Sequence, residues 1–249
     1  MDRHRYLNPP ITEAICQFNF SEPLPWTVVT PGIIYQSLQP NYPAEPERQE
    51  QLQATFGRAD DKTPPEFQIN RAADRVLYRD DSATRLLVLS PVNISVNSLP
   101  PYEGWPNLAR RAKEAFQALR RASCYPTIST LSVRYINRIR LGFGNVDLSS
   151  YITIPIHAAP FDDATISAFF NRTESSLGAA VKVNVTYASL QQDPADEGAA
   201  DVVLDIECFQ NLDHATSVDD ALAIVEHLKE IENDQFESVI TDECRRLFK

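Results

Sequence analysis

Residues 128–141, ISTLSVRYINRIRL, constrain the fold of this chain more than any other stretch. Val133, Tyr135 and Ile139 fall on one face and the arginines on the other, which is the pattern of a β-strand with one buried face. Asn137 is the single polar residue of the apolar face. A buried amide without partners costs about 1–3 kcal/mol, so we expect Asn137 to bond to a neighbouring strand, a bulge or a chain terminus. We place this strand at the centre of a sheet, where two halves of the chain meet.

The segments around that strand predict two halves of similar order. The first half, residues 1–125, reads as a strand at 11–20, a helix starting at Pro31, a segment at 45–56 that fits a helical turn or a strand entry, a hairpin of 75–80 and 83–91, and a helix at 107–123. Residues 92–96 continue the second hairpin strand past a bulge at Ser90-Pro91.

The second half, residues 126–249, contains the strand 128–141, a short strand at 151–156, a helix at 163–177, strands at 179–190 and 200–210, and a final helix capped by Ser217. We therefore predict an α+β fold: a largely antiparallel sheet built from two strand-helix-strand-strand-helix halves, with the helices on one face. No long Gly/Ser linker separates the halves, so we treat residues 1–249 as a single unit.

The composition predicts a globular protein with a proper core. Hydrophobic residues make up 43% and charged residues 23% of the 249 residues. No stretch approaches the roughly 20 consecutive apolar residues that a membrane span needs. The early basic residues have no apolar segment behind them, and the four cysteines form no C-x-x-C pair. We expect a cytoplasmic protein without a membrane partner.

Familiar catalytic and metal-binding motifs are missing from the sequence. The chain has only seven glycines, and LGFGNVD at 141–147 lacks the third glycine of a dinucleotide-binding turn. The four histidines are scattered, without a second His or Cys at ligand spacing. The acidic loop at 193–201 has Ala195 at position three of a calcium loop and Leu204 falls at position twelve, where that loop needs ligands. We expect no cofactor, no metal and no catalytic residue, and lean towards a protein that is not an enzyme.

Charge is unevenly distributed along the chain. The formal net charge is -11, yet residues 105–140 hold eight basic residues and one acidic residue. One interpretation groups basic side chains of this segment around an anion or an acidic partner. The other pairs them with the 20 acidic residues of 141–249, and we favour it. Direct nucleic-acid binding is not expected of such an acidic chain. The candidate binding residues are Arg134, Arg138, Arg140, Arg110, Lys113 and Arg120.

Three stretches resemble a known family: YLNPPITEAICQFNF near the start, LSVRYINRI in the middle and FESVITDECRRLF at the end. The family is a sporadically distributed bacterial family of uncharacterised proteins. Its motifs are an N-terminal Y-x-x-P-P-I-x-E-A strand, a central R-Y-x-N-R-I strand and a C-terminal F-E-x-x-I-T helix. The resemblance transfers no catalytic residue. It draws attention to Pro9, Pro10, Glu13, Arg134, Asn137, Arg138 and residues 236–241, and Glu13 could form an ion pair with an arginine on an adjacent strand.

Three hypotheses for function follow. The preferred one is a non-catalytic protein-interaction component that binds a basic partner protein, with a homo-oligomer left open. The family's patchy distribution resembles that of defence or toxin–antitoxin genes, so an accessory or neutralising role in such a module is implied by that resemblance. The alternatives are a small-anion or nucleotide binder that uses the basic strand and helix, and an enzyme with an unfamiliar site between the halves.

Overall fold

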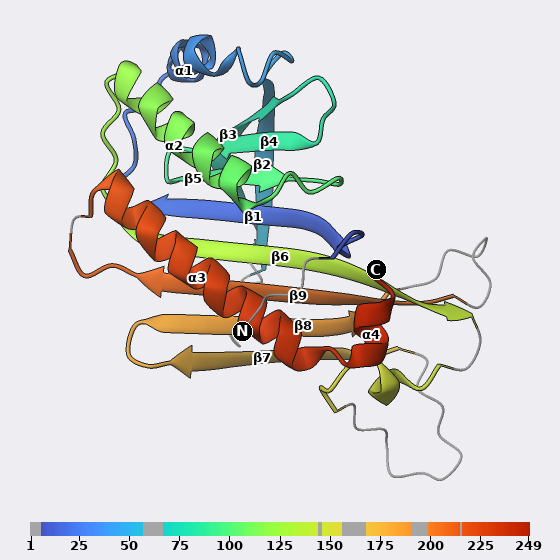
Figure 1. Ribbon diagram of the computed structural model, residues 1–249. Helices are drawn as coiled ribbons and strands as arrows, with labels where there is room; N and C mark the ends of the chain where they lie inside the picture. The colour runs from blue at the N-terminus through green and yellow to red at the C-terminus, as the bar shows by residue number, and fades with distance from the viewer. Residues whose placement is uncertain (1–5, 57–66, 144–145, 156–167, 191–198, 215) are drawn as a thin grey trace.

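The structure, a computed structural model, describes residues 6–56, 67–143, 146–155, 168–190, 199–214 and 216–249. These residues form an antiparallel sheet of nine strands in the order β2-β3-β4-β5-β1-β6-β9-β8-β7 (Figure 1). The predicted α+β class and antiparallel sheet are confirmed. The strands are β1 (Ile11–Phe20), β2 (Glu47–Phe56), β3 (Phe67–Arg79), β4 (Arg85–Leu89), β5 (Asn93–Ser98), β6 (Ile128–Phe143), β7 (Phe170–Leu177), β8 (Val181–Ser189) and β9 (Ala199–Asn211).

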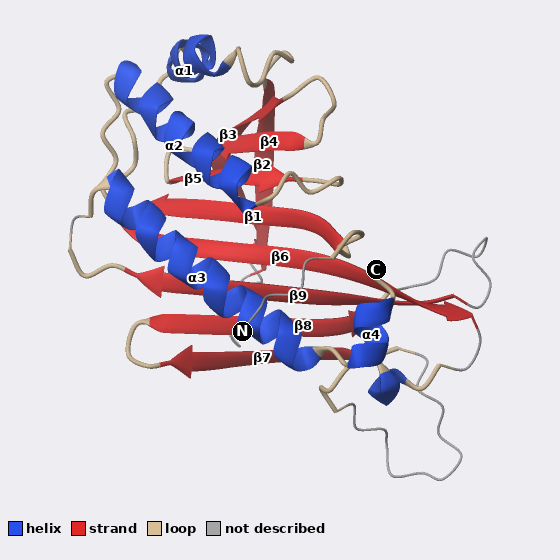
Figure 2. Cartoon of the chain, in the orientation of Figure 1, coloured by secondary structure: helices blue, strands red, loops and turns tan. Residues whose placement is uncertain are grey.

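The described residues also form four α-helices on one face of this sheet: α1 (Thr30–Leu38), α2 (Trp105–Arg121), α3 (Val218–Val239) and α4 (Asp242–Arg246). Figure 2 shows α2 and α3 lying across the same side of the strands. Helix α2 contacts β5 and β1, and α3 contacts β6 and β9. The hydrophobic core is the layer between these helices and the sheet. None of the helices formed by the described residues has the length and hydrophobicity required to cross a membrane.

Strand β6 lies near the centre of the sheet, as expected of residues 128–141, and it pairs antiparallel with β1. Cys16 pairs with Val133, and both side chains are fully buried on the helix-covered face. The β1 register shifts between Ile11 and Glu13, opposite Asn137. The Asn137 side chain is buried there and its Nδ2 donates to the Leu204 carbonyl of β9 at 3.2 Å. The expectation that this amide bonds to a neighbouring strand is confirmed, and it lies beside a bulge.

The second half differs from its predicted order. Within the expected helix at 163–177, residues from Phe170 onwards form strand β7, and residues 163–167 lie outside the described residues. Phe169 packs against Tyr187 of β8, with ring centroids 4.7 Å apart, so pairing with β8 replaces the helix that the local pattern favoured. Of the expected strand at 151–156, residues 151–155 form one isolated bridge, Ile152 to Ile240, rather than a strand, and residue 156 lies outside the described residues. The two-halves pattern of strand-helix-strand-strand-helix is therefore not confirmed.

The first half follows its prediction more closely, with one correction. The Ser90 hydroxyl accepts hydrogen bonds from the backbone N–H groups of Val92 and Asn93, at 3.2 and 3.1 Å. The chain therefore reverses at Ser90, and residues 93–98 form a separate strand, β5, which pairs with β4. The expected continuation of one strand past a bulge is wrong, because a serine can close a turn through its side chain. Residues 47–56 form strand β2, the second of the two alternatives for this segment.

Candidate functional site

The β6 arginines lie on the face of the sheet that the helices leave uncovered. Alternation along β6 turns Val133, Tyr135 and Ile139 into the core, so Arg134, Arg138 and Arg140 point the other way. Their side chains are 41%, 46% and 62% exposed. All three are therefore reachable by solvent and by a ligand.

Carboxylates of β9 already occupy these arginines. Arg134 binds both oxygens of Asp205, at 2.8 and 2.6 Å, and these hydrogen bonds raise the pKa of its guanidinium further above its ordinary value. Arg138 donates from Nε to Asp201 at 2.7 Å, and Arg140 Nε lies 3.5 Å from the other oxygen of Asp201. This agrees with the interpretation in which the basic strand pairs with acids of the second half.

The basic residues of α2 form a separate group on the opposite side of the sheet. Arg110 pairs with Glu114 one turn along the helix at 2.5 Å. Lys113 bridges to Asp219 at the start of α3 at 2.8 Å. Arg120 is exposed near the end of the helix. The sheet thus separates these three residues from the β6 arginines, so the two groups cannot surround one small anion.

Glu13 belongs to a hydrogen-bond network rather than to a direct ion pair. Its Oε1 accepts from Nδ2 of Asn97 on β5 at 2.7 Å. Its charge contributes to the raised pKa of Arg134, after the hydrogen bonds and charge of Asp205 and the charge of Glu207. Asp205, and not Glu13, is the ion-pair partner of Arg134.

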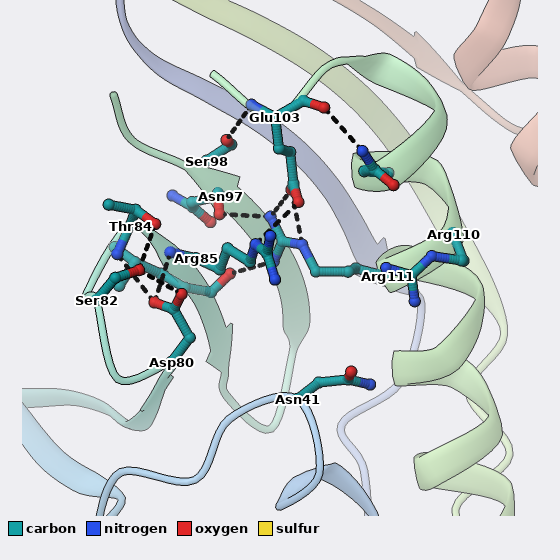
Figure 3. A network of polar contacts seen from close by, with 12 residues as sticks. Asn41, Asp80, Ser82, Thr84, Arg85, Asn97, Ser98, Glu103, Arg110 and Arg111 are labelled. Carbon is teal, nitrogen blue, oxygen red and sulfur yellow. Dashed lines mark hydrogen bonds and ion pairs between the residues drawn. The ribbon is translucent and has the colours of Figure 1, made fainter. Parts of the chain in front are cut away.

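A buried arginine that the candidate set did not include anchors α2 to the sheet (Figure 3). Arg111 is 2% exposed. Its Nε donates to Glu103 at 2.7 Å, and one terminal nitrogen donates to the Tyr42 hydroxyl at 2.6 Å. The other terminal nitrogen donates to the Asn97 carbonyl at 2.8 Å. The sequence held a signal for this role, since Arg111 follows Leu108 by three residues on the apolar stripe of the helix.

The partner of Arg111 links the network to the β3–β4 turn. Glu103 also lies 3.2 Å from Nε of Arg85. The Asp80 carboxylate accepts from the backbone N–H groups of Thr84 and Arg85, both at 2.9 Å, and Figure 3 shows this turn beside the arginine. Asn97 Oδ1 and Glu103 Oε2 are buried without a hydrogen bond, although Oε2 is the Glu103 atom that lies near Arg85. The Arg111 guanidinium is shielded from solvent. The network is built to hold elements together rather than to receive a ligand.

A second buried charge site lies under α3. Glu232 is 2% exposed, and burial raises the pKa of its carboxyl well above the ordinary value. The hydroxyls of Tyr102 and Tyr135 share a 2.8 Å hydrogen bond, and the charge of Glu232 adds to burial in raising the pKa of both tyrosines. Burial thus favours the protonated form of Glu232, and its carboxyl is enclosed in the core rather than accessible as a catalytic group.

An exposed apolar patch surrounds the start of α1. Val28, Val29 and Ile33 are 88%, 60% and 46% exposed. Val28 also lines a surface pocket of about 450 Å³ whose wall includes Trp26, Pro31, Pro46 and Arg48. We name Val28, Val29, Ile33 and this pocket the α1 patch. Apolar surface of this kind, next to a recess that can accept a side chain, is typical of a protein-binding site.

Within the described ranges, no three His, Cys, Asp or Glu side chains gather in a way that could hold a metal ion. The free cysteines of these ranges are all buried. No protein-family model and no curated protein matches the chain. The candidate sites therefore rest on geometry alone.

Proposed function

We propose that this protein is a non-catalytic interaction component that binds a partner protein through the α1 patch. The observation that carries the proposal is the exposure of Val28, Val29 and Ile33, of which Val28 lines the pocket. Three neighbouring apolar side chains left in water cost free energy that a partner would recover on binding. The resemblance to a sporadically distributed bacterial family adds the proposal that the partner belongs to a defence or toxin–antitoxin-like module, in which this protein is an accessory or neutralising component.

The charge of the chain indicates the chemistry of the partner. The formal net charge is -11. The pocket residue Pro46 lies between Glu45 and Glu47, both exposed, although Glu47 is paired with Arg79 at 2.8 Å. A partner that offers an apolar anchor flanked by basic side chains would fit this surface. Opposite charge would speed the encounter and disfavour acidic competitors.

An extract of the source organism provides the test. The tagged protein should retain a partner, and Val28→Asp and Ile33→Asp should each abolish its capture. Leu247→Asp introduces the same charge at an apolar position that is 43% exposed, directly after α4 and far from α1 in Figure 1, and should retain the partner. Thermal melts check that all variants fold. The proposal is contradicted if the tagged protein is recovered without a partner at every salt concentration. It is also contradicted if Val28→Asp does not change the capture of the partner.

Anion binding is the second candidate, and one observation favours it. Arg138 and Arg140 share the single carboxylate of Asp201, and both side chains are about half exposed or more, at 46% and 62%. A phosphate would have to compete with Asp201 for them. Thermal-shift screening with nucleotides and inorganic phosphate tests this, since a ligand at 100 times its Kd stabilises by about 2.7 kcal/mol. An unchanged Tm with all of these ligands removes the candidate.

A further inference from the structure

Strand β7 forms one edge of the sheet. It is last in the strand order, and among the described residues it pairs only with β8 (Figure 1). Seven of its eight side chains are exposed, namely Phe170 and the six from Arg172 to Leu177. The sequence FNRTESSL contains no proline and no lysine, the residues that commonly block strand edges. No other described segment pairs with the outer edge, which is therefore open to a further strand within the described part of the chain.

The backbone of β7 determines which residues face that open edge. The Phe169 carbonyl accepts from the Ser189 N–H of β8 at 3.1 Å, so the backbone groups of Phe169 point inward. Because these directions alternate along an antiparallel strand, the N–H and C=O groups of Phe170, Arg172, Glu174 and Ser176 point outward. These four residues present the unpaired donors and acceptors.

We propose that β7 pairs antiparallel with β7 of a second copy of this chain, about a two-fold axis at Thr173. In this register Arg172 of one copy lies directly opposite Glu174 of the other, and the symmetry repeats the pair. Phe170 lies opposite Ser176, so every outward-facing residue meets another outward-facing residue. The same sequence supplies both sides of a complementary edge.

The charges of Arg172 and Glu174 favour this register over the registers obtained by shifting the two-fold axis along the strand. Moving the axis by one residue to Glu174 places the two Glu174 side chains opposite each other, and moving it to Arg172 does the same with the arginines. Directly opposed like charges destabilise a strand pair, whereas opposite charges stabilise it. An axis between two residues would set inward-facing backbone groups against outward-facing ones. Among these arrangements, the axis at Thr173 alone satisfies both the charges and the backbone.

The side chains also gain apolar contact in this arrangement. Leu177 is 54% exposed, and it would lie opposite Phe169 of the second copy. Phe170, which is 71% exposed on the other face, would be partly covered by the added strand. The α1 patch remains free, because α1 and β7 lie at opposite ends of the molecule in Figure 1. The pairing therefore does not depend on the proposed partner protein.

Charge reversal at the edge tests the pairing in solution. Light scattering across a concentration series should give a species near twice 28.0 kDa for the unaltered protein. Arg172→Glu and Glu174→Arg should each raise the dimer dissociation constant at least about tenfold, since each variant opposes like charges twice. The double variant R172E/E174R restores opposite charges and should restore the dimer. A monomer at every concentration, or a dimer that neither single variant weakens, overturns the proposal.

Engineered cysteines test the register itself. Thr173→Cys would oppose its own copy in a non-hydrogen-bonded pair, with Cα atoms about 4.5 Å apart, within reach of a disulfide. Ser175→Cys on the same face is the control, because its copy would lie more than about 12 Å away along the strand. We expect a cross-linked dimer on a non-reducing gel for T173C and none for S175C. Equal cross-linking of both variants, or none for T173C, contradicts the two-fold axis.

Discussion

Removing the buried side chain of Arg111 should strongly destabilise the fold. The variant Arg111→Met keeps the aliphatic stem but leaves Glu103 without its buried cation and removes the hydrogen bonds to the Tyr42 hydroxyl and the Asn97 carbonyl. Removing one partner of a buried ion pair costs about 3–5 kcal/mol, so the free energy of unfolding should fall by that amount in urea titration. Arg110→Met is the matched control. Arg110 is 51% exposed, and its loss should cost less than about 1 kcal/mol. Equal losses for the two variants would contradict the anchoring role.

Glu232 should make stability depend on pH. Its folded pKa lies well above the ordinary 4.5 because of burial, so the folded protein keeps a proton that the unfolded chain releases. The free energy of unfolding should therefore fall as the pH rises from 4.5 towards the folded pKa. Glu232→Gln mimics the protonated side chain and should remove this fall, leaving the variant more stable than the unaltered protein at pH 8.

The control for Glu232 is Asp234→Asn, an exposed position on the same helix. It removes one carboxylate without altering the core and should keep the pH dependence of the unaltered protein. Urea titrations at pH 5 and pH 8 measure all three proteins. If Glu232→Gln keeps the pH dependence of the unfolding free energy, that dependence comes from another titratable group.

Among the elements, α3 depends on its first turn. The Ser217 hydroxyl accepts from the Asp220 N–H at 3.1 Å and donates to the Asp220 carboxylate at 2.6 Å, which confirms the cap predicted from the sequence. Ser217→Ala should lower the free energy of unfolding by about 1 kcal/mol. Ser217→Asp retains an acceptor and should lose much less. If both variants lose the same amount in urea titration, the cap is not what stabilises this helix start.

At the scale of the whole molecule, neither half should fold alone. Strands β1 and β6 pair across the join, and the core beneath α2 and α3 is one continuous cluster with residues from both halves. Residues 1–125 and 126–249, produced separately, should each lack a cooperative melting transition by circular dichroism, whereas the intact chain should show one. A cooperative transition in either fragment would mean that the halves are independent domains.

The sequence by itself determined the elements whose own residues carry the periodicity. Strand β1 begins and ends where its alternation does, α2 follows its apolar stripe, and α3 starts at its serine cap. Alternation along β6 also showed that its arginines share one face. Local periodicity suffices in these cases because each segment buries one face whatever lies above it.

Only the tertiary structure decided where pairing and burial override the local pattern. Strand β7 is a strand because β8 offers an edge to it, although its sequence also fits a helix. The β6 arginines are paired because the register of β9 places Asp201 and Asp205 beside them, and sequence distance does not encode a register. Arg111 is buried because Glu103, Tyr42 and the Asn97 carbonyl meet around it. Contacts between residues far apart in the chain form only when the sheet assembles. These contacts decide whether an arginine is held in the structure by ion pairs or is free to bind a ligand.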